Sequence, residues 1–267
     1  MIGVFDSGVG GLSVWREMIK IMPCERFVYV SDSGYCPYGP KPKEEIIERA
    51  RKITEYLINR GASVIVVACN TATAAAIDYL REFYPIQFVG MEPAVKPAAL
   101  NTITGVIGVL ATKGTFNGEL YLRTLHKFAA NAIVIEQIGE GLVELVEQGK
   151  VNTPQAEALL KKYLLPMVEK NVDSLVLGCT HYPFLIETIQ KIIGNKMVII
   201  NPAPAVAKRV KEVVNGINYM GKEGDKGQML SVNEFVTTGN NIELINEMVY
   251  SIIPAKSKNY IYNMVSL

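Results

Sequence analysis

The sequence has few cysteines and lacks the spacing by which cysteines usually hold a structural metal. Four cysteines occur in 267 residues, and no two of them form a Cys-x-x-Cys pair. The local zinc signature is therefore absent. Apolar residues make up 49% of the chain, enough for a core without disulfide bonds. We therefore expect reduced thiols, each either buried as a small apolar side chain or chemically reactive.

Long apolar runs and a strong net charge are also missing. Stretches such as Val64–Ala68 are far shorter than the roughly 20 residues that cross a bilayer. The first residues lack the basic and apolar regions of a signal peptide. The formal net charge is +1, so no overall field attracts nucleic acid or an acidic membrane. We expect a cytoplasmic protein that binds neither nucleic acid nor membrane.

Short β-branched runs alternate with longer amphipathic patterns along the chain. The run Val64–Val67 is too continuous for a sheet with one exposed face, which indicates a strand covered on both sides. Strands are predicted at 2–5, 27–30, 63–68, 105–111, 132–136, 173–177, 197–200 and 229–236. Helices are predicted at 12–22, from Pro42 to 57, and at 71–82, 115–127, 141–148, 153–170, 184–193, 205–214 and 242–252, with a surface loop at 216–227. Such alternation predicts an α/β fold with largely parallel sheets.

One segment of the first half is repeated in the second half. Ser63–Thr71 and Asp173–His181 each contain a buried strand, a small residue, a cysteine, polar residues and then a helix. The two cysteines, Cys69 and Cys179, are separated by 110 residues. Open α/β sheets bind ligands beyond the carboxyl ends of their strands. The repeat therefore predicts two pseudo-symmetric halves that present one thiol each to a shared cleft.

Two thiols on opposite sides of a cleft suit inversion at a carbon atom. One takes the α-proton from one face and the other delivers a proton to the opposite face. A single base would tend to return the proton to the face it came from. Each cysteine precedes a helix N-terminus, which lowers the pKa of a thiol. His181 would tune Cys179, and Asp6 would pair with Cys69 in the same way.

The glycine-rich segment Asp6–Gly11 lies between a predicted strand and helix, and three interpretations stay open. A dinucleotide fingerprint needs its third glycine at Ser13, although Asp32 could mimic the acid that binds ribose. A turn that offers backbone N–H groups to a small anion fits as well. A tight turn with its aspartate as a helix cap is the structural alternative. Cys24 and Cys36 have no counterpart in the repeat, and we interpret both as structural or incidental.

Five segments together resemble glutamate racemases of the aspartate/glutamate racemase family. They are Phe5–Leu12, Pro37–Gly39, Ala68–Ala72, Ala111–Thr115 and Leu177–Pro183. The last is highly specific, because aspartate racemases usually have Thr-Glu after the second cysteine. The resemblance implies an enzyme without a cofactor that interconverts L- and D-glutamate and supplies D-glutamate for peptidoglycan. It also implies two α/β domains with the active site in the cleft between them, and a homodimer.

The resemblance implies Cys69 and Cys179 as the acid/base pair, assisted by Asp6 and His181, and no metal. In the L-to-D direction Cys179 is the base and Cys69 the acid. The residues that fall where the family contacts its substrate are Ser7, Tyr38, Gly39, Asn70, Thr71, Thr112, Thr115 and Thr180. Glu147 matches a family glutamate, although on its own it would be part of a solvated helix face. The implied domains are 1–93 plus 208–267, and 94–207.

The chain departs from the family pattern in three places. Ile138–Gly141 replaces a segment that usually contains Cys-Pro, Asn201 stands where the family usually has Asp, and Ser33–Cys36 is unusual. These departures concern substrate preference and the role of Glu147. Two alternatives therefore stay open. One is racemisation of aspartate or another amino acid, and the other is an inactive relative that only binds an amino acid or a protein partner.

Overall fold

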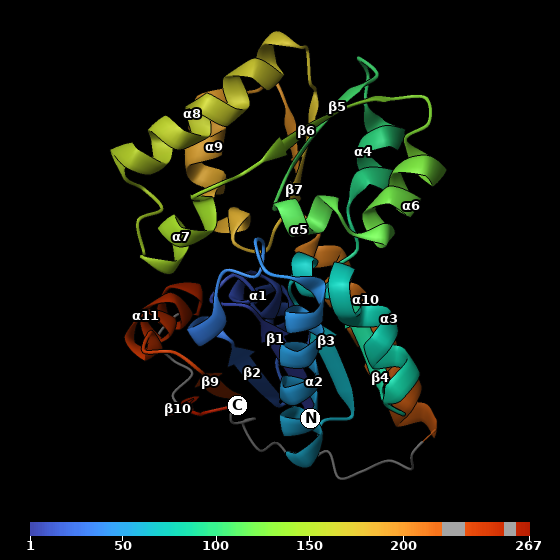
Figure 1. Cartoon of the computed structure of the whole chain (residues 1–267), viewed down its shortest axis with the longest axis vertical. Coiled ribbons are helices and arrows are strands. Elements are labelled where there is room, and N and C mark those ends of the chain that lie inside the picture. Colours follow the sequence, from blue (N-terminus) through green and yellow to red (C-terminus); the bar gives the residue numbers. More distant parts are fainter. Residues whose placement is uncertain (221–232, 254–259) are drawn as a thin grey trace.

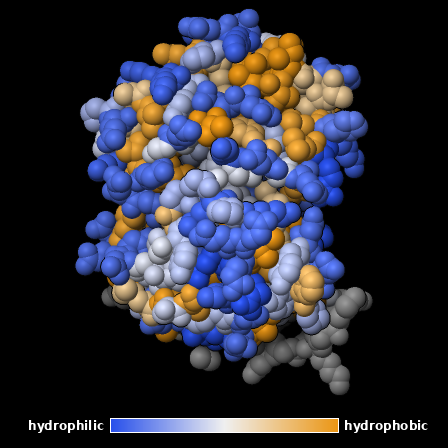
Figure 2. Space-filling model, viewed as in Figure 1, coloured by the Kyte–Doolittle hydropathy of each residue, from blue (hydrophilic) through white to orange (hydrophobic). Residues whose placement is uncertain are grey.

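The structure, a computed structural model, describes residues 1–220, 233–253 and 260–267. Figure 1 shows two α/β lobes stacked along the long axis of the molecule, and Figure 2 shows hydrophilic and hydrophobic residues interspersed over the same face. One lobe is built on a six-stranded sheet with the order β10-β9-β2-β1-β3-β4, and the other on a four-stranded sheet with the order β6-β5-β7-β8. All the strand pairs in both sheets are parallel. The predicted α/β fold with parallel sheets is confirmed.

The first lobe has strands whose β-branched runs are buried on both faces. Its strands are β1 (Ile2–Asp6), β2 (Phe27–Ser31), β3 (Val64–Val67), β4 (Gln87–Gly90), β9 (Asn233–Thr237) and β10 (Tyr260–Met264). Its helices are α1 (Leu12–Ile21), α2 (Lys43–Asn59), α3 (Asn70–Phe83), α10 (Ala203–Met220), α11 (Ile242–Ile252) and the 3₁₀ turn η1 (Ser33–Tyr35). The ring of Trp15 on α1 packs edge-on against Phe235 of β9, with centroids 5.0 Å apart. This contact fixes the C-terminal segment to the N-terminal core.

The second lobe repeats the same layering on a smaller sheet. Its strands are β5 (Val106–Ala111), β6 (Ile133–Ile138), β7 (Ser174–Gly178) and β8 (Val198–Ile200). Its helices are α4 (Val95–Asn101), α5 (Lys113–Phe116), α6 (Glu119–Phe128), α7 (Leu142–Glu147), α8 (Pro154–Glu169), α9 (Ile186–Ile193) and the 3₁₀ turn η2 (Tyr182–Leu185). The Thr153 hydroxyl caps α8 by accepting a hydrogen bond from the Ala156 N–H, as a Thr-Pro start predicts.

The two sheets share one topology over four strands. β1 lies between β2 and β3, with β4 outside β3, and β5 lies likewise between β6 and β7, with β8 outside β7. Cys69 follows β3 and Cys179 follows β7, which are equivalent strands in this comparison. The repeat noticed in the sequence is therefore a repeat of structure.

Some elements differ from the prediction. β4, α4 and β10 were not predicted, because β4 is short, α4 contains a proline and β10 is a half-exposed edge strand. The predicted helix 115–127 is two helices, since Gly118 has an extended backbone where α6 begins. The start of the predicted loop 216–227 is wrong, because α10 continues to Met220. The rest of that loop and residues 229–232 and 254–259 lie outside the described residues.

The chain passes between the lobes after β4 and again before α10 (Figure 1). α10 packs on α1, β3 and β4 of the first lobe, and β9 and β10 extend the first sheet beyond β2. The exact division into 1–93 plus 208–267 and 94–207 stays a prediction. None of the described helices combines the length and apolar character needed to cross a bilayer.

One carboxylate ties the start of β7 to the turn that leads into β5. Asp173 accepts hydrogen bonds from the Thr102 hydroxyl and from the backbone N–H groups of Ile103 and Thr104. Desolvation alone would raise the pKa of Asp173, but these hydrogen bonds lower it from 3.8 to about 2. The pKa of Asp173 is lower in the folded than in the unfolded protein. Ionised Asp173 therefore stabilises the fold at pH values above its unfolded pKa, and this stabilisation is lost as the pH falls through its folded pKa.

We predict that Asp173→Asn lowers the unfolding temperature at pH 7 by about 2–4 °C, a loss of about 1 kcal/mol after allowance for solvent screening. The difference from wild type should shrink as the pH falls from about 4 to about 2. Thermal unfolding followed by circular dichroism measures both effects. Asp78→Asn is the control, because Asp78 is exposed and lies 3.6 Å from Arg123 at the surface. An equal shift in the control, or a pH-independent difference, would contradict the prediction.

Candidate active site

A narrow cavity lies between the lobes, where loops from both sheets meet. Its volume is about 10 Å³, which is room for about one water molecule. It is lined by Ser7, Pro37, Tyr38, Gly39, Cys69, Asn70, Thr71, Thr112, Val143, Cys179, Thr180 and His181. The structure thus brings both cysteines of the repeat to one cavity, one from each lobe. Of the residues predicted for the site, Asp6, Thr115 and Glu147 lie just outside this lining.

Cys69 caps helix α3 at the end of β3. Its sulfur accepts a hydrogen bond from the Ala72 N–H at 3.4 Å, and its thiol points to the Ser7 hydroxyl at 3.8 Å. The helix start was expected to lower the thiol pKa; burial outweighs the lowering by the Ala72 N–H, so the net shift is upward. Burial raises the pKa of Cys69 well above its usual value, and the nearby Asp6 adds to the increase. The protonated thiol is therefore the favoured form, which suits a proton donor.

Cys179 lies beside the only buried histidine among the described residues. The Cys179 sulfur is 3.7 Å from Nδ1 of His181, whose Nε2 is 2.6 Å from Oε1 of Glu147. Burial lowers the pKa of His181, but hydrogen bonds with Cys179, Cys36 and Glu147 outweigh it and raise that pKa above its usual value. The imidazole is in position to exchange a proton with the Cys179 sulfur.

Asp6 holds the glycine turn rather than the Cys69 thiol. Its Oδ2 accepts hydrogen bonds from the N–H groups of Gly8 and Gly11 at 3.2 and 3.0 Å, and its Oδ1 accepts one from the Thr180 hydroxyl at 3.2 Å. Burial raises the pKa of Asp6, and His181 partly offsets this. Within the described residues Asp6 makes no hydrogen bond to Cys69, so their coupling is electrostatic.

Glu147 connects the second lobe to the glycine turn of the first. Its Oε1 accepts a hydrogen bond from the Val9 N–H at 2.6 Å, in addition to the contact with His181. A side chain at Gly8 would collide with this carboxylate, since a Cβ there would lie 1.8 Å from Oε1. The sequence pointed to Glu147 only through the family resemblance, because its helix face has no pattern that distinguishes it from a solvated one.

The mouth of the cavity is closed by contacts between the lobes. The hydroxyl groups of Thr71 and Thr112 are 2.8 Å apart. A Cβ at Gly114 would lie 2.7 Å from Thr71 Cγ2 and 3.1 Å from the Gly39 carbonyl, so only glycine fits. Outside lies a cavity of about 360 Å³ that also contacts Gly39 and Thr71 and is lined by three lysines: Lys41, Lys43 and Lys113. A substrate of amino-acid size requires the lobes to separate here.

A buried ion pair positions Tyr38 in the wall of the cavity. The Tyr38 hydroxyl donates to Oδ2 of Asp32 at 2.5 Å, and Arg49 donates to both oxygens of the same carboxylate. The sequence suggested Asp32 only as a possible ribose ligand, and that alternative is wrong because its oxygens already bind Tyr38 and Arg49. Arg49 itself was missed, since a single arginine on a helix gives no pattern that marks it as buried. Pro37 and Val143 were not predicted as lining residues either.

Three comparisons with known proteins agree on one family. The sequence profile of the Asp/Glu/Hydantoin racemases matches residues 10–210. A glutamate racemase from Herpetosiphon aurantiacus is 41% identical over 238 residues, which is 89% of this chain and 92% of the relative. One from Ectopseudomonas mendocina is 48% identical over 214 residues, covering 80% of this chain and 81% of the relative.

Solved structures show the same fold. A glutamate racemase isoform from Bacillus anthracis superposes with a TM-score of 0.85 and 32% identity, covering 100% of this chain and 97% of that one. A glutamate racemase from Francisella tularensis, solved in complex with D-glutamate, superposes with a TM-score of 0.82 and 28% identity, covering 99% of this chain and 97% of that one. The chain therefore belongs to the Asp/Glu/Hydantoin racemase family and is an amino-acid racemase.

Proposed function

We propose that this enzyme interconverts L- and D-glutamate by proton transfer at the α-carbon, with Cys69 and Cys179 as the two acid/base groups and without a cofactor. The observation that carries the proposal is that the two thiols, at equivalent positions of a structural repeat, line one cavity from opposite lobes. The glutamate racemases that this chain resembles support glutamate as the substrate.

In the L-to-D direction, the Cys179 thiolate takes the α-proton and the Cα–H bond breaks. The protonated Cys69 then delivers its proton to the opposite face of the carbanion, and the roles are exchanged in reverse. His181 exchanges protons with Cys179, while Glu147 and Asp6 hold the imidazole and the glycine turn. A placed acid or base typically contributes about 10²–10⁴-fold. The remainder comes from donors that stabilise the developing carbanion in a cavity that excludes water.

Neutral donors hold the charged groups of the substrate in this proposal. The lining side chains proposed for binding are Ser7, Tyr38, Asn70, Thr71, Thr112 and Thr180, and Gly39 contributes its backbone groups. The Thr115 hydroxyl lies 3.0 Å from the Thr112 hydroxyl and holds it in place. The Asn70 amide supports this, because its Oδ1 and Nδ2 are buried and make no hydrogen bond within the described chain. A buried polar group without a partner costs about 1–3 kcal/mol, which a bound substrate removes.

The family resemblance supports three further parts of the proposal. The enzyme would act in the cytoplasm, supply D-glutamate for peptidoglycan synthesis and form a homodimer. Racemisation of aspartate is the less favoured alternative: an aspartate racemase from Picrophilus torridus shares the fold with a TM-score of only 0.53 and 21% identity.

We predict that Cys69→Ser and Cys179→Ser each lower the rate of racemisation by about 10²–10⁴-fold, because a serine hydroxyl is a far weaker acid than a thiol. The two enantiomers have equal free energy, so kcat/KM must fall equally in both directions. Circular dichroism of glutamate measures the rate. Cys24→Ser, which changes an exposed thiol far from the cavity, is the control and should keep wild-type activity. Near-normal turnover in either cavity variant would remove its thiol from the mechanism.

A second prediction concerns hydrogen exchange in D₂O. The wild-type enzyme should place deuterium on the α-carbon of the product enantiomer. Cys69→Ser should exchange the α-proton of L-glutamate without inverting it, and Cys179→Ser should do the same for D-glutamate, because each variant keeps one base. Proton NMR with chiral chromatography measures exchange and inversion separately. If each variant instead exchanged the α-proton of the opposite enantiomer, the assigned roles of the two cysteines would be reversed. Exchange with aspartate alone would identify a different substrate. No exchange with any amino acid would indicate a binding protein.

A third prediction tests Asn70. We expect Asn70→Ala to raise KM for glutamate by about 5- to 150-fold, the equivalent of about 1–3 kcal/mol of lost hydrogen bonding. The unfolding temperature should stay the same or rise, since the variant removes a buried amide that has no partner among the described residues. Steady-state kinetics and thermal unfolding give the two readouts. An unchanged KM with lower stability would mean that Asn70 is structural.

A further inference from the structure

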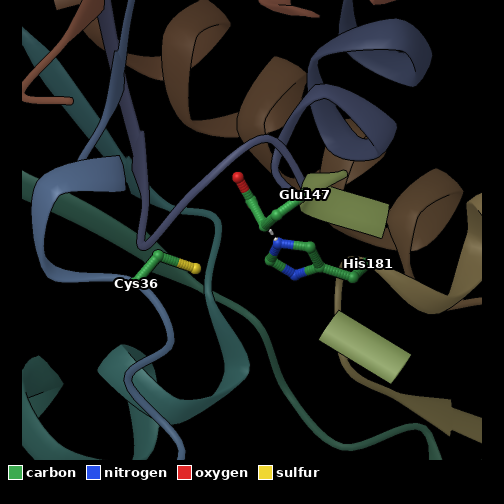
Figure 3. A group of neighbouring side chains, drawn as sticks. All are labelled: Cys36, Glu147 and His181. Carbon is green, nitrogen blue, oxygen red and sulfur yellow. Dashed lines mark hydrogen bonds and ion pairs between the residues drawn. The ribbon is translucent and has the colours of Figure 1, made fainter. Parts of the chain in front are cut away.

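A second group of reactive side chains meets at His181, and its other two members lie outside the lining of the cavity that the two thiols share. It consists of Cys36, Glu147 and His181, and one sulfur, one oxygen and one nitrogen atom of these residues all lie within 4.8 Å of one another. Figure 3 shows the Cys36 sulfur and the Glu147 carboxylate approaching the same edge of the imidazole. The mechanism above makes no use of Cys36, which lines no part of the two-thiol cavity.

The donor atoms of this group match the preferences of one class of metal ion. A thiolate, an imidazole and a carboxylate are the ligands that bind zinc, which is commonly held by three protein ligands and a water molecule at open sites. Magnesium and calcium prefer oxygen atoms alone. Cys36 lies 111 residues before Glu147, and Glu147 lies 34 residues before His181, which is why no local cysteine spacing marked the site.

The group can be reached without passing through the substrate cavity. A separate cavity of about 270 Å³ is lined by Cys36 and Glu147, together with Ser33, Pro37, Val143, Glu144, Gln148, Asn240 and Asn241. Both Cys36 and Glu147 are partly exposed, whereas His181 is buried at the inner end of the group. A cation can therefore enter from the surface and meet the imidazole from the side opposite to Cys179.

We propose that Cys36, Glu147 and His181 bind zinc, or another divalent ion of similar softness, and that the bound ion inhibits racemisation. The inhibitory part rests on the proposed function. As the ion binds, the Cys36 S–H bond breaks, its proton passes to solvent and a sulfur–metal bond forms. The Nε2–H bond of His181 breaks as well, its proton also passes to solvent, and the freed Nε2 lone pair binds the ion.

Binding also moves the Glu147 carboxylate, which is one of the groups that connect the lobes. Oε1 of Glu147 now lies 2.6 Å from Nε2 of His181 and 2.6 Å from the Val9 nitrogen. Metal–ligand bonds of about 2.0–2.3 Å in a tetrahedral arrangement separate neighbouring ligands by roughly 3.5 Å. The carboxylate must therefore move away from the imidazole by roughly 1 Å. The ion thus replaces the direct contact between Nε2 and Oε1 and shifts the carboxylate that accepts the hydrogen bond from the glycine turn.

Binding is tested first, without substrate, so that the result does not depend on the racemase reaction. Zinc is titrated by calorimetry into the wild type, Cys36→Ser, Cys24→Ser and the double variant Cys69→Ser/Cys179→Ser. We expect one zinc per chain in all but Cys36→Ser, in which affinity falls at least about 100-fold, since even the loss of an outer partner costs about 10–100-fold. Cobalt should give a thiolate-to-metal absorption band that Cys36→Ser lacks, and Glu147→Gln should weaken binding as a second variant.

Inhibition is tested next, with each variant compared with itself in the absence of zinc. Zinc should slow glutamate racemisation by the wild type and Cys24→Ser, a chelator should restore it, and Cys36→Ser should resist. Lack of zinc binding by the wild type would overturn the proposal. So would binding that survives in Cys36→Ser and disappears in the double variant, because the ion would then lie on the cavity thiols. Zinc bound at Cys36 without any racemase activity would instead contradict the proposed function alone.

Discussion

The carboxyl ends of two parallel sheets face each other across a cavity of about 10 Å³, and the whole site depends on this face-to-face arrangement. In a parallel sheet every strand ends at the same edge, so the polar residues and helix starts that follow the strands gather there. Each half of this molecule brings one such edge and one thiol. In the proposed mechanism neither half alone would present an acid and a base to both faces of a carbon atom, and the repeat of strand order explains why the two thiols occupy equivalent positions.

Close packing between the edges decides both the residue types and the electrostatics of the site. Gly10 must be glycine because a Cβ there would lie 2.3 Å from the imidazole of His181. The same packing excludes water, so burial raises the pKa of Asp6 and of the Cys69 thiol. For the same reason the Asn70 side chain has no hydrogen-bond partner in the described part of the chain. These groups destabilise the closed protein locally, and in the proposed function a bound substrate with a carboxylate and an ammonium group would supply the missing interactions.

The sequence alone predicted those features of the fold and site that local residue patterns determine. The strand at Val64–Val67 and the cysteines beyond β3 and β7 follow from β-branched runs and spacing, and both thiols do reach one cavity. The short strand β4 and the edge strand β10 have too little pattern to be predicted. The helix start lowers the pKa of Cys69 as expected, but burial outweighs it, and the depth of burial is a property of the assembled lobes. The placement of Cys36 beside His181 depends on that assembly too.

The tight mouth at Thr71 and Thr112 has a consequence for the turnover cycle. After one inversion in the proposed mechanism, the sulfur that began as a base holds a hydrogen and the other has lost one. The enzyme is then prepared only for the reverse reaction, and a hydrogen must pass from one sulfur to the other before the same enantiomer can react again. Bulk water is the natural carrier, and it reaches both sulfurs only while the lobes are apart. The movement that releases product therefore also resets the catalyst.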